Sequence, residues 1–204
     1  MKLYIVRHAR SQRNAGHQSK EDTELDEIGK VQAQRLGRYF HDVKLDKVYC
    51  SPLKRAKATL EEIVPYIKGV PVSYTSQIVE HKMGIYGRNG HDDWAGYAQE
   101  AERQQIPFHL IKPEGGDSLA DTYRRAGRFY RDLLKKHSQE EILIVGHGIF
   151  SLYIILNALG LDLSEGKYYN LSNASISTLN IKEGKVTDFH VNDYNHLIRE
   201  GMRK

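Results

Sequence analysis

The sequence predicts an α/β protein: a three-layer α/β/α sandwich with a mostly parallel sheet and a small cap insertion. Short apolar runs alternate with segments of helical periodicity, which is the pattern of parallel strands joined by helices. Two of the runs end abruptly in charged or polar residues, and the alternation stops over residues 80–113. Because 204 residues suit one domain with its own core, we expect a single domain over residues 1–204, with the cap insertion at about 80–113.

The expected strands are short and rich in β-branched or aromatic residues. Residues 3–6 read Leu-Tyr-Ile-Val, and residues 141–147 contain the most apolar run, Ile-Leu-Ile-Val. Continuous apolar runs of this kind are typical of strands that are buried on both faces. The other strands are expected at residues 47–50, 70–74, 176–181 and 186–191.

Helical periodicity fills the segments between these strands. Apolar residues recur there at the spacing of one helix face, with polar residues on the other face. Ser51 and Pro52 are favourable residues for the start of a helix, so one helix is expected to begin there. The helices are expected at residues 27–40, 51–66, 117–137 and 149–159.

Residues 80–113, which we call the cap segment, differ from the rest of the chain. Gly84, Gly87, Gly90 and Gly96 interrupt a stretch rich in tyrosine, histidine and charged residues. Long irregular insertions in compact domains are commonly functional. We therefore expect short helices here that lie over the strand ends.

The charge of the chain does not indicate a nucleic-acid partner. The formal net charge is only +4, with a pI near 9.0, and the lysines and arginines are spread along the chain. A nucleic-acid binder is expected to cluster them on one face. Two groups of cations, Arg10 with Arg13 and Lys54 with Arg55 and Lys57, could bind phosphate, but each group alone is more typical of a solvated face.

Several features favour a cytoplasmic protein without a membrane partner. Cys50 is the only cysteine, so there is no intrachain disulfide and a reducing compartment is compatible. The first apolar run reaches Arg7 after four residues, which is too short for the core of a signal peptide. Residues 149–159 are apolar but too short to span a bilayer.

Polar residues follow two of the predicted strands directly. Arg7 and His8 come after the first strand, and His147 follows residues 141–146 and stands between two glycines. A neutral imidazole is nucleophilic, and a guanidinium binds phosphate through two donors. From these residues alone, a structural role for either histidine remains open.

Five stretches resemble the motifs of the histidine phosphatases, also called the phosphoglycerate mutase-like superfamily, in the order in which that family has them. The first is Arg7-His8-Ala9-Arg10-Ser11 with Asn14, which resembles the family's Arg-His-Gly signature. The others are residues 25–33, 51–56 (with Arg55), 145–148 (with His147), and 173–177 with 192–193 and 196–197. The resemblance spans nearly the whole chain.

The resemblance implies a phosphohistidine on His8, with His147 hydrogen-bonded to the transferring phosphoryl group. Arg7 and Arg55 are expected to clamp the phosphoryl oxygens, and Asn14 to add a neutral donor. We also expect these cations to keep His8 unprotonated through like-charge repulsion. No cofactor and no metal are implied.

Glu80 is the expected general acid, since Glu80 and Gly84 resemble the family's "Glu, three residues, Gly" motif. A leaving alkoxide needs a proton, and a carboxyl group near the phosphate can supply it. His81, the next residue, is the alternative for this role.

The chain departs from the family pattern at several positions. Ala9 replaces the usual glycine, Tyr86 stands where phosphatases often have tryptophan, and Asp117 replaces a glutamate. The methyl group of Ala9 raises the question whether the local backbone keeps the family shape. A second anionic group on the substrate could be recognised by Arg10 and by the cap cations Lys82, Arg88 and His91, although a solvated surface role is open for each. His81 is a further possible specificity residue.

The predicted function is hydrolysis of a phosphomonoester, through phosphohistidine, on a small phosphorylated metabolite. One alternative is mutase activity of the phosphoglycerate mutase type, although residues 80–84 lack that motif's arginine and tyrosine. A second alternative is a non-catalytic phosphate-binding or interaction module, against which both histidines and both arginines count. The expected partner is a small-molecule phosphate ester, and a homodimer is left open.

Overall fold

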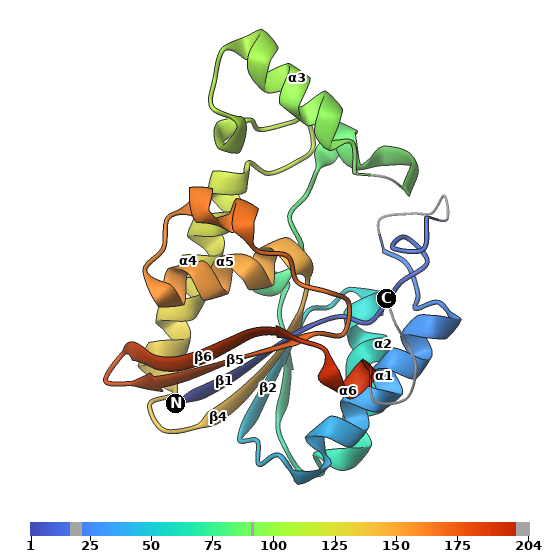
Figure 1. The fold of residues 1–204 in the computed structure, drawn as a ribbon, viewed down its shortest axis with the longest axis vertical. Coiled ribbons are helices and arrows are strands. Elements are labelled where there is room, and N and C mark those ends of the chain that lie inside the picture. Colours follow the sequence, from blue (N-terminus) through green and yellow to red (C-terminus); the bar gives the residue numbers. More distant parts are fainter. Residues whose placement is uncertain (17–21, 91, 199–204) are drawn as a thin grey trace.

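The computed structural model describes residues 1–16, 22–90 and 92–198, without the side chains of residues 88–90 and 167–168. Its centre is one six-stranded sheet with the order β3-β2-β4-β1-β5-β6 (Figure 1). Strands β1 to β4 pair in parallel, while β5 and β6 are antiparallel to their neighbours. The strands are β1 (Lys2–Arg7), β2 (Lys47–Cys50), β3 (Val72–Tyr74), β4 (Glu141–Gly146), β5 (Ile176–Lys182) and β6 (Lys185–Asp193). The mostly parallel sheet is thus confirmed.

Helices cover both faces of this sheet. The main ones are α1 (Glu27–Tyr39), α2 (Lys54–Ile63), α4 (Leu119–Lys136) and α5 (Gly148–Leu159). Successive side chains of β1 point to opposite faces: Leu3 and Ile5 join the core beneath α4 and α5, whereas Tyr4 and Val6 join the core beneath α1 and α2. The predicted three-layer sandwich is therefore confirmed.

The helix after β2 starts later than predicted. Leu53 keeps an extended backbone (φ −70°, ψ 143°), so α2 begins at Lys54 instead of Ser51. Proline disfavours helical backbone in the residue before it, which excludes Ser51 from a regular helix. The last predicted turn, Val64–Tyr66, is a 3₁₀ helix. Because Ser51 lies outside the helix, its hydroxyl can lie at the end of the sheet, where it is 2.8 Å from Nε2 of His147.

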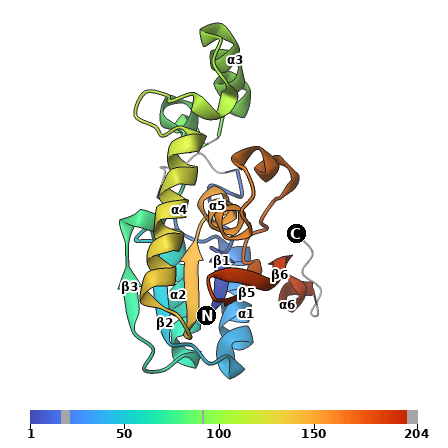
Figure 2. The same cartoon turned by 90° about the vertical axis from the view of Figure 1, so that its left-hand side faces the viewer.

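The cap segment contains short helices beyond the strand ends. A 3₁₀ turn at Gly84–Gly90 is followed by α3 (Trp94–Gln104) and a second 3₁₀ turn at Phe108–Leu110. Figure 2 shows α3 standing at the far end of the molecule from the sheet. The segment has a small core of its own, made by Met83, Tyr97, Ala101 and Ile111.

Gly84 is required by the shape of this segment. Its φ is +56°, and a Cβ there would lie 2.3 Å from the carbonyl oxygen of Glu114. The glycine four residues after Glu80 thus has a steric reason in this chain.

The described chain closes with the helix α6 (Asn195–Ile198), which packs on α1. No helix within residues 1–16, 22–90 and 92–198 is both long and apolar enough to span a membrane.

Candidate active site

The two predicted histidines meet because β1 and β4 are parallel neighbours that end together. Arg7 pairs with Gly146 in the register of the two strands, and the backbone N–H of His8 donates to the Gly146 carbonyl at 2.9 Å. The ring centroids of His8 and His147 lie 5.2 Å apart. Both residues are buried, with 3% and 0% exposure.

The hydrogen bonds of His8 define its reactive atom. Its Nδ1 lies 2.7 Å from the Ala9 carbonyl oxygen, which can only accept, so Nδ1 bears the hydrogen. The lone pair is then on Nε2, which accepts from Nε of Arg55 at 3.1 Å. Nε2 is therefore the nucleophilic atom in this geometry.

His8 is held in its neutral form. Burial lowers the pKa of His8 well below its ordinary value, and the charges of Arg55 and Arg7 lower it further. The sequence prediction attributed the neutral state of His8 to the neighbouring cations alone. In the structure, loss of solvation lowers the pKa of His8 more than these cations do. The neutral imidazole keeps its lone pair available near neutral pH.

His147 lies behind His8 and offers one unoccupied nitrogen. Its Nε2 is 2.8 Å from the Ser51 hydroxyl, while Nδ1 is buried and has no partner among the described residues. A hydroxyl that donates to Nε2 leaves the hydrogen on Nδ1, where it can be donated to an oxygen. Burial lowers the pKa of His147 well below its ordinary value, and Arg55 adds to this effect.

Two guanidinium groups lie beside the histidines. Arg7 donates through Nη1 to the Leu171 carbonyl, and its buried Nε has no partner among the described residues. Burial lowers the pKa of both Arg7 and Arg55, and the Glu80 carboxylate partly offsets this. Arginine is so strong a base that both guanidinium groups remain charged despite this shift.

Glu80 is fixed at the N-terminus of α5. Its Oε1 accepts from the backbone N–H groups of His81 (2.9 Å) and Phe150 (3.1 Å), and Oε2 accepts from that of Ile149 (3.3 Å). The first N–H groups of a helix have no partner within the helix, so a carboxylate there completes their hydrogen bonding. These bonds hold the Glu80 carboxylate beside the cavity that contains His8.

Asn14 is turned so that its amide nitrogen is left as a donor. Its Oδ1 accepts from the Ser11 hydroxyl at 2.9 Å and from Nδ2 of Asn173 at 3.2 Å. Asn173 also donates to the His8 carbonyl at 3.1 Å. The next residue, Ala174, has a positive φ of 57° and donates to the His8 carbonyl at 3.2 Å. The sequence prediction gave Asn173 and Ala174 no individual role.

Ala9 keeps an ordinary backbone. It is not among the described non-glycine residues with positive φ, and its N–H donates to the Thr59 hydroxyl at 3.0 Å. Its methyl group is fully buried in the core beneath α1 and α2. Ala9 therefore replaces the family's glycine without backbone strain in this structure.

A cavity of about 370 Å³ opens onto His8. His147 does not line it directly but lies behind His8, within ring contact. The cavity brings together most of the predicted site: Arg7, His8, Asn14, Arg55, Glu80, His81 and Lys82. Its lining also includes Ser11 and Asp92, to which the sequence prediction gave no role in the site, and Arg13, which that prediction named only as one of two neighbouring arginines that could bind phosphate.

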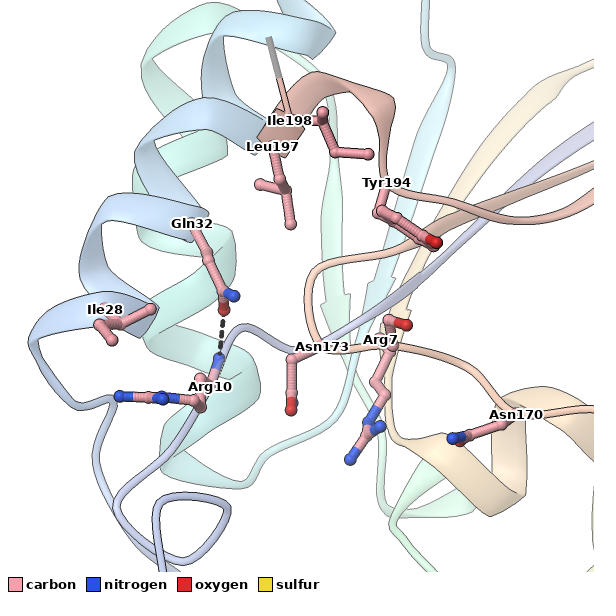
Figure 3. Close-up of a pocket in the computed structure, with 10 residues that line it drawn as sticks. Arg7, Arg10, Ile28, Gln32, Asn170, Asn173, Tyr194, Leu197 and Ile198 are labelled. Carbon is pink, nitrogen blue, oxygen red and sulfur yellow. Dashed lines mark hydrogen bonds between the residues drawn. The ribbon is translucent and has the colours of Figure 1, made fainter. Parts of the chain in front are cut away.

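Arg10 lies elsewhere, in a second cavity of about 490 Å³ that contains neither His8 nor Glu80 (Figure 3). Its Nε donates to Asp26 at 2.7 Å, and its backbone N–H donates to Gln32 at 2.8 Å. Asp26 is the N-cap of α1, and its carboxylate draws the guanidinium away from the catalytic cavity. The second cavity shares Arg7 with the catalytic cavity, so recognition of a second anionic group of the substrate by Arg10 stays a prediction.

The other predicted specificity residues differ in position. Lys82 is exposed at the cavity rim. His81 is buried, its Nδ1 lies 3.0 Å from the Thr122 hydroxyl, and its ring stacks on Trp94. Burial lowers the pKa of His81, which makes it a poor ligand for an anion. The side chain of Arg88 and the whole of His91 lie outside the part of the chain that the structure describes.

Comparison with known proteins identifies the family of this site. The family model described as "Histidine phosphatase superfamily (branch 1)" matches residues 3–194. The chain belongs to this superfamily. Phosphoserine phosphatase 1 of Hydrogenobacter thermophilus is 31% identical over 200 residues, which cover 97% of this chain and 94% of that protein.

Two further relatives of the superfamily bear on the reaction. A Salmonella choleraesuis protein named "Probable phosphoglycerate mutase GpmB" is 26% identical over 188 residues, covering 91% of this chain and 87% of that protein. The solved phosphoserine phosphatase from Entamoeba histolytica, in complex with 3-phosphoglyceric acid, is 25% identical with a TM-score of 0.76. That likeness covers 97% of this chain and 99% of the other.

Proposed function

We propose that this histidine phosphatase hydrolyses a small phosphorylated metabolite through a phosphohistidine on Nε2 of His8. The observation that supports this most directly is the buried, neutral His8, whose lone pair on Nε2 accepts from Arg55 and which also feels the charge of Arg7. The similarity to phosphoserine phosphatases of other organisms supports a small phosphate ester as substrate.

In the first step, the phosphoryl group displaces Arg55 from His8. Arg55 and Arg7 then bind its oxygens, and Nε2 of His8 attacks the phosphorus while the ester P–O bond breaks. The imidazole becomes positively charged, and the Ala9 carbonyl, which accepts from Nδ1, stabilises this charge. Glu80, in its acid form, gives its proton to the departing alkoxide.

In the second step, water replaces the alcohol. The Glu80 carboxylate takes a proton from the attacking water, the P–N bond breaks, and its electron pair returns to Nε2 of His8. Inorganic phosphate leaves and Glu80 is again protonated. The N–H groups of His81, Ile149 and Phe150 hold the same carboxylate in place for both transfers.

Trapping the intermediate tests this proposal. The protein is mixed with excess p-nitrophenyl phosphate, quenched in alkali, where phosphohistidine is stable, and digested for mass spectrometry. We expect one phosphoryl group on the peptide that contains His8, and its loss on acid treatment. A phosphoryl group on another residue, or turnover without any phosphoenzyme, would contradict the mechanism.

Phosphoryl transfer to a second alcohol is the alternative, favoured by the likeness to a protein named as a mutase. A mutase must keep water away from its phosphoenzyme until the acceptor is in line. Here Asn14, Lys82 and Asp92 line the cavity and are exposed, which favours water as the acceptor. Incubation with 3-phosphoglycerate, with and without 2,3-bisphosphoglycerate, separates the two. Rapid formation of 2-phosphoglycerate with little free phosphate would establish the mutase reaction.

The remaining sequence predictions concern the cellular location of the protein and its macromolecular partners. A cytoplasmic location stays a prediction, with which the single buried Cys50 is compatible. A nucleic-acid partner is still not expected, and a homodimer stays open.

A further inference from the structure

We propose, building on the phosphatase reaction proposed above, that Arg13 and Lys82 form a subsite for a carboxylate of the substrate. The preferred substrates are then phosphorylated carboxylic acids, and Arg13 is the specificity-determining residue. Arg13 lies in the loop after β1, six residues beyond Arg7, and its side chain lines the catalytic cavity.

Arg13 is held in place by the cap segment. Its Nη2 donates to the Asp92 carboxylate at 2.5 Å and to the Gly87 carbonyl at 3.1 Å. The side chain is only 15% exposed, so the charge is well shielded from water. These two contacts fix the guanidinium where the loop after β1 meets the cap segment.

One arm of this guanidinium has no hydrogen-bond partner within residues 1–16, 22–90 and 92–198. Nη1 of Arg13 is buried and makes no hydrogen bond with any described residue. Leaving a buried charged donor unsatisfied is costly, so such a group in a native cavity indicates a missing partner. The existing partner of the other arm is a carboxylate, and the fork of donors in arginine matches a second one.

The other cations of the cavity have different tasks. Arg55 binds His8, and Arg7 lies beside it, so these two are assigned to the phosphoryl group. Lys82 is exposed at the rim of the same cavity as Arg13. A substrate carboxylate that lies a few bonds from the phosphate would then bind to both cations. Arg13 is the ligand in a fixed position, and the exposed Lys82 side chain can adjust its position to the carboxylate. A volume of about 370 Å³ admits a small metabolite of this kind.

The test compares two esters that differ only in the carboxylate. 3-Phosphoglycerate carries it, whereas glycerol 3-phosphate has a hydroxymethyl group in its place. We expect wild-type protein to prefer 3-phosphoglycerate in kcat/KM by about tenfold or more, as an added charged hydrogen bond provides. Arg13→Gln should remove most of this preference, chiefly by raising KM for the carboxylated ester. Arg13→Lys should restore part of it, because the charge returns without the fork.

Asp92→Asn is the matched control. It weakens the tether of Arg13 but leaves the guanidinium charge, so the preference for 3-phosphoglycerate should be retained. If Arg13 is only a tether for the cap segment, Arg13→Gln and Asp92→Asn will slow both esters equally with an unchanged preference. That result, or an absence of preference in the wild type, would overturn the subsite.

The reaction itself is followed separately with p-nitrophenyl phosphate. Turnover of this compound without any preference between the two esters overturns the subsite alone. Wild-type protein that hydrolyses none of the three compounds overturns the phosphatase proposal as well.

Discussion

The floor of the catalytic cavity and its cap segment are built in different ways. On the floor, His8 and His147 follow two paired parallel strands and are almost fully buried. The cap segment instead packs around four buried residues and meets the loop after β1 through the contacts of Arg13. The floor, together with Glu80 at the first residue of the cap segment, therefore fixes the atoms that react, whereas residues 84–110 can be altered without disturbing them. This division is expected where one chemistry is used on different substrates.

Removal of the nucleophile should give the largest effect. His8→Ala removes the atom that attacks phosphorus, so we expect turnover to fall by at least about a thousandfold. The fold should persist, because the strands of the sheet keep their own packing. Circular dichroism checks the fold, and His41→Ala, at an exposed histidine, is the control. Phosphoenzyme formation in His8→Ala would remove His8 from its assigned role.

Glu80→Gln should separate the proton transfers from the phosphoryl transfer. The amide oxygen can take the place of Oε1 and accept from the N–H groups of His81 and Phe150, so the side chain stays in position and loses only the weaker bond from Ile149; the main loss then concerns the proton. We expect a loss of about a hundredfold to ten-thousandfold on alkyl phosphates. Phosphorylation by p-nitrophenyl phosphate, whose leaving group needs no proton, should change far less in single-turnover experiments. Glu61→Gln, at an exposed position, is the control. Equal losses on both substrates would indicate a positioning role, or transfer by His81.

Stability measurements test whether the sheet and the cap segment unfold separately. Leu143 is fully buried in the sheet, so Leu143→Ala should lower the free energy of unfolding by about 2–5 kcal/mol. Ile111, 1% exposed, belongs to the small core of the cap segment. Ile111→Ala should lower the global value less and should expose residues 84–110 to proteolysis. Equal losses in urea unfolding would mean that cap segment and sheet unfold as one unit.

The smallest expected effect is the pH dependence of stability. Burial lowers the pKa of His8 and His147 in the folded state, so the unfolded chain binds more protons just below pH 6.5. Stability should therefore decrease as the pH falls below about 6.5, by up to about 1.4 kcal/mol per pH unit for each histidine. His81 and His196 act in the same direction, so His147→Gln should reduce the slope without abolishing it. A slope that is unchanged in His147→Gln would contradict this assignment.

The sequence was most informative where periodicity controls the structure. Alternating apolar runs located the strands, and the parallel pairing of β1 with β4 then brings His8 and His147 to one edge. The loop after β1 has no such period, and there the prediction chose Arg10 over Arg13. What decides between these two arginines is the position of distant carboxylates, Asp26 for Arg10 and Asp92 for Arg13. Neither pairing follows from local spacing. Burial lowers the pKa of His8 more than the neighbouring charges do, and this burial depends on packing between elements that are far apart in the sequence.

The hydrogen bond from Arg55 to Nε2 of His8 gives the resting protein a built-in restraint on its reactivity. While Arg55 donates to that lone pair, the imidazole is a poor target for alkylating or acylating reagents. An anion that draws the guanidinium toward itself releases the lone pair at the moment when phosphorus is within reach. The ligand that His8 attacks is thus the same ligand that frees its lone pair. The reactivity of His8 should therefore increase with the fraction of protein that has an anion bound at Arg7 and Arg55.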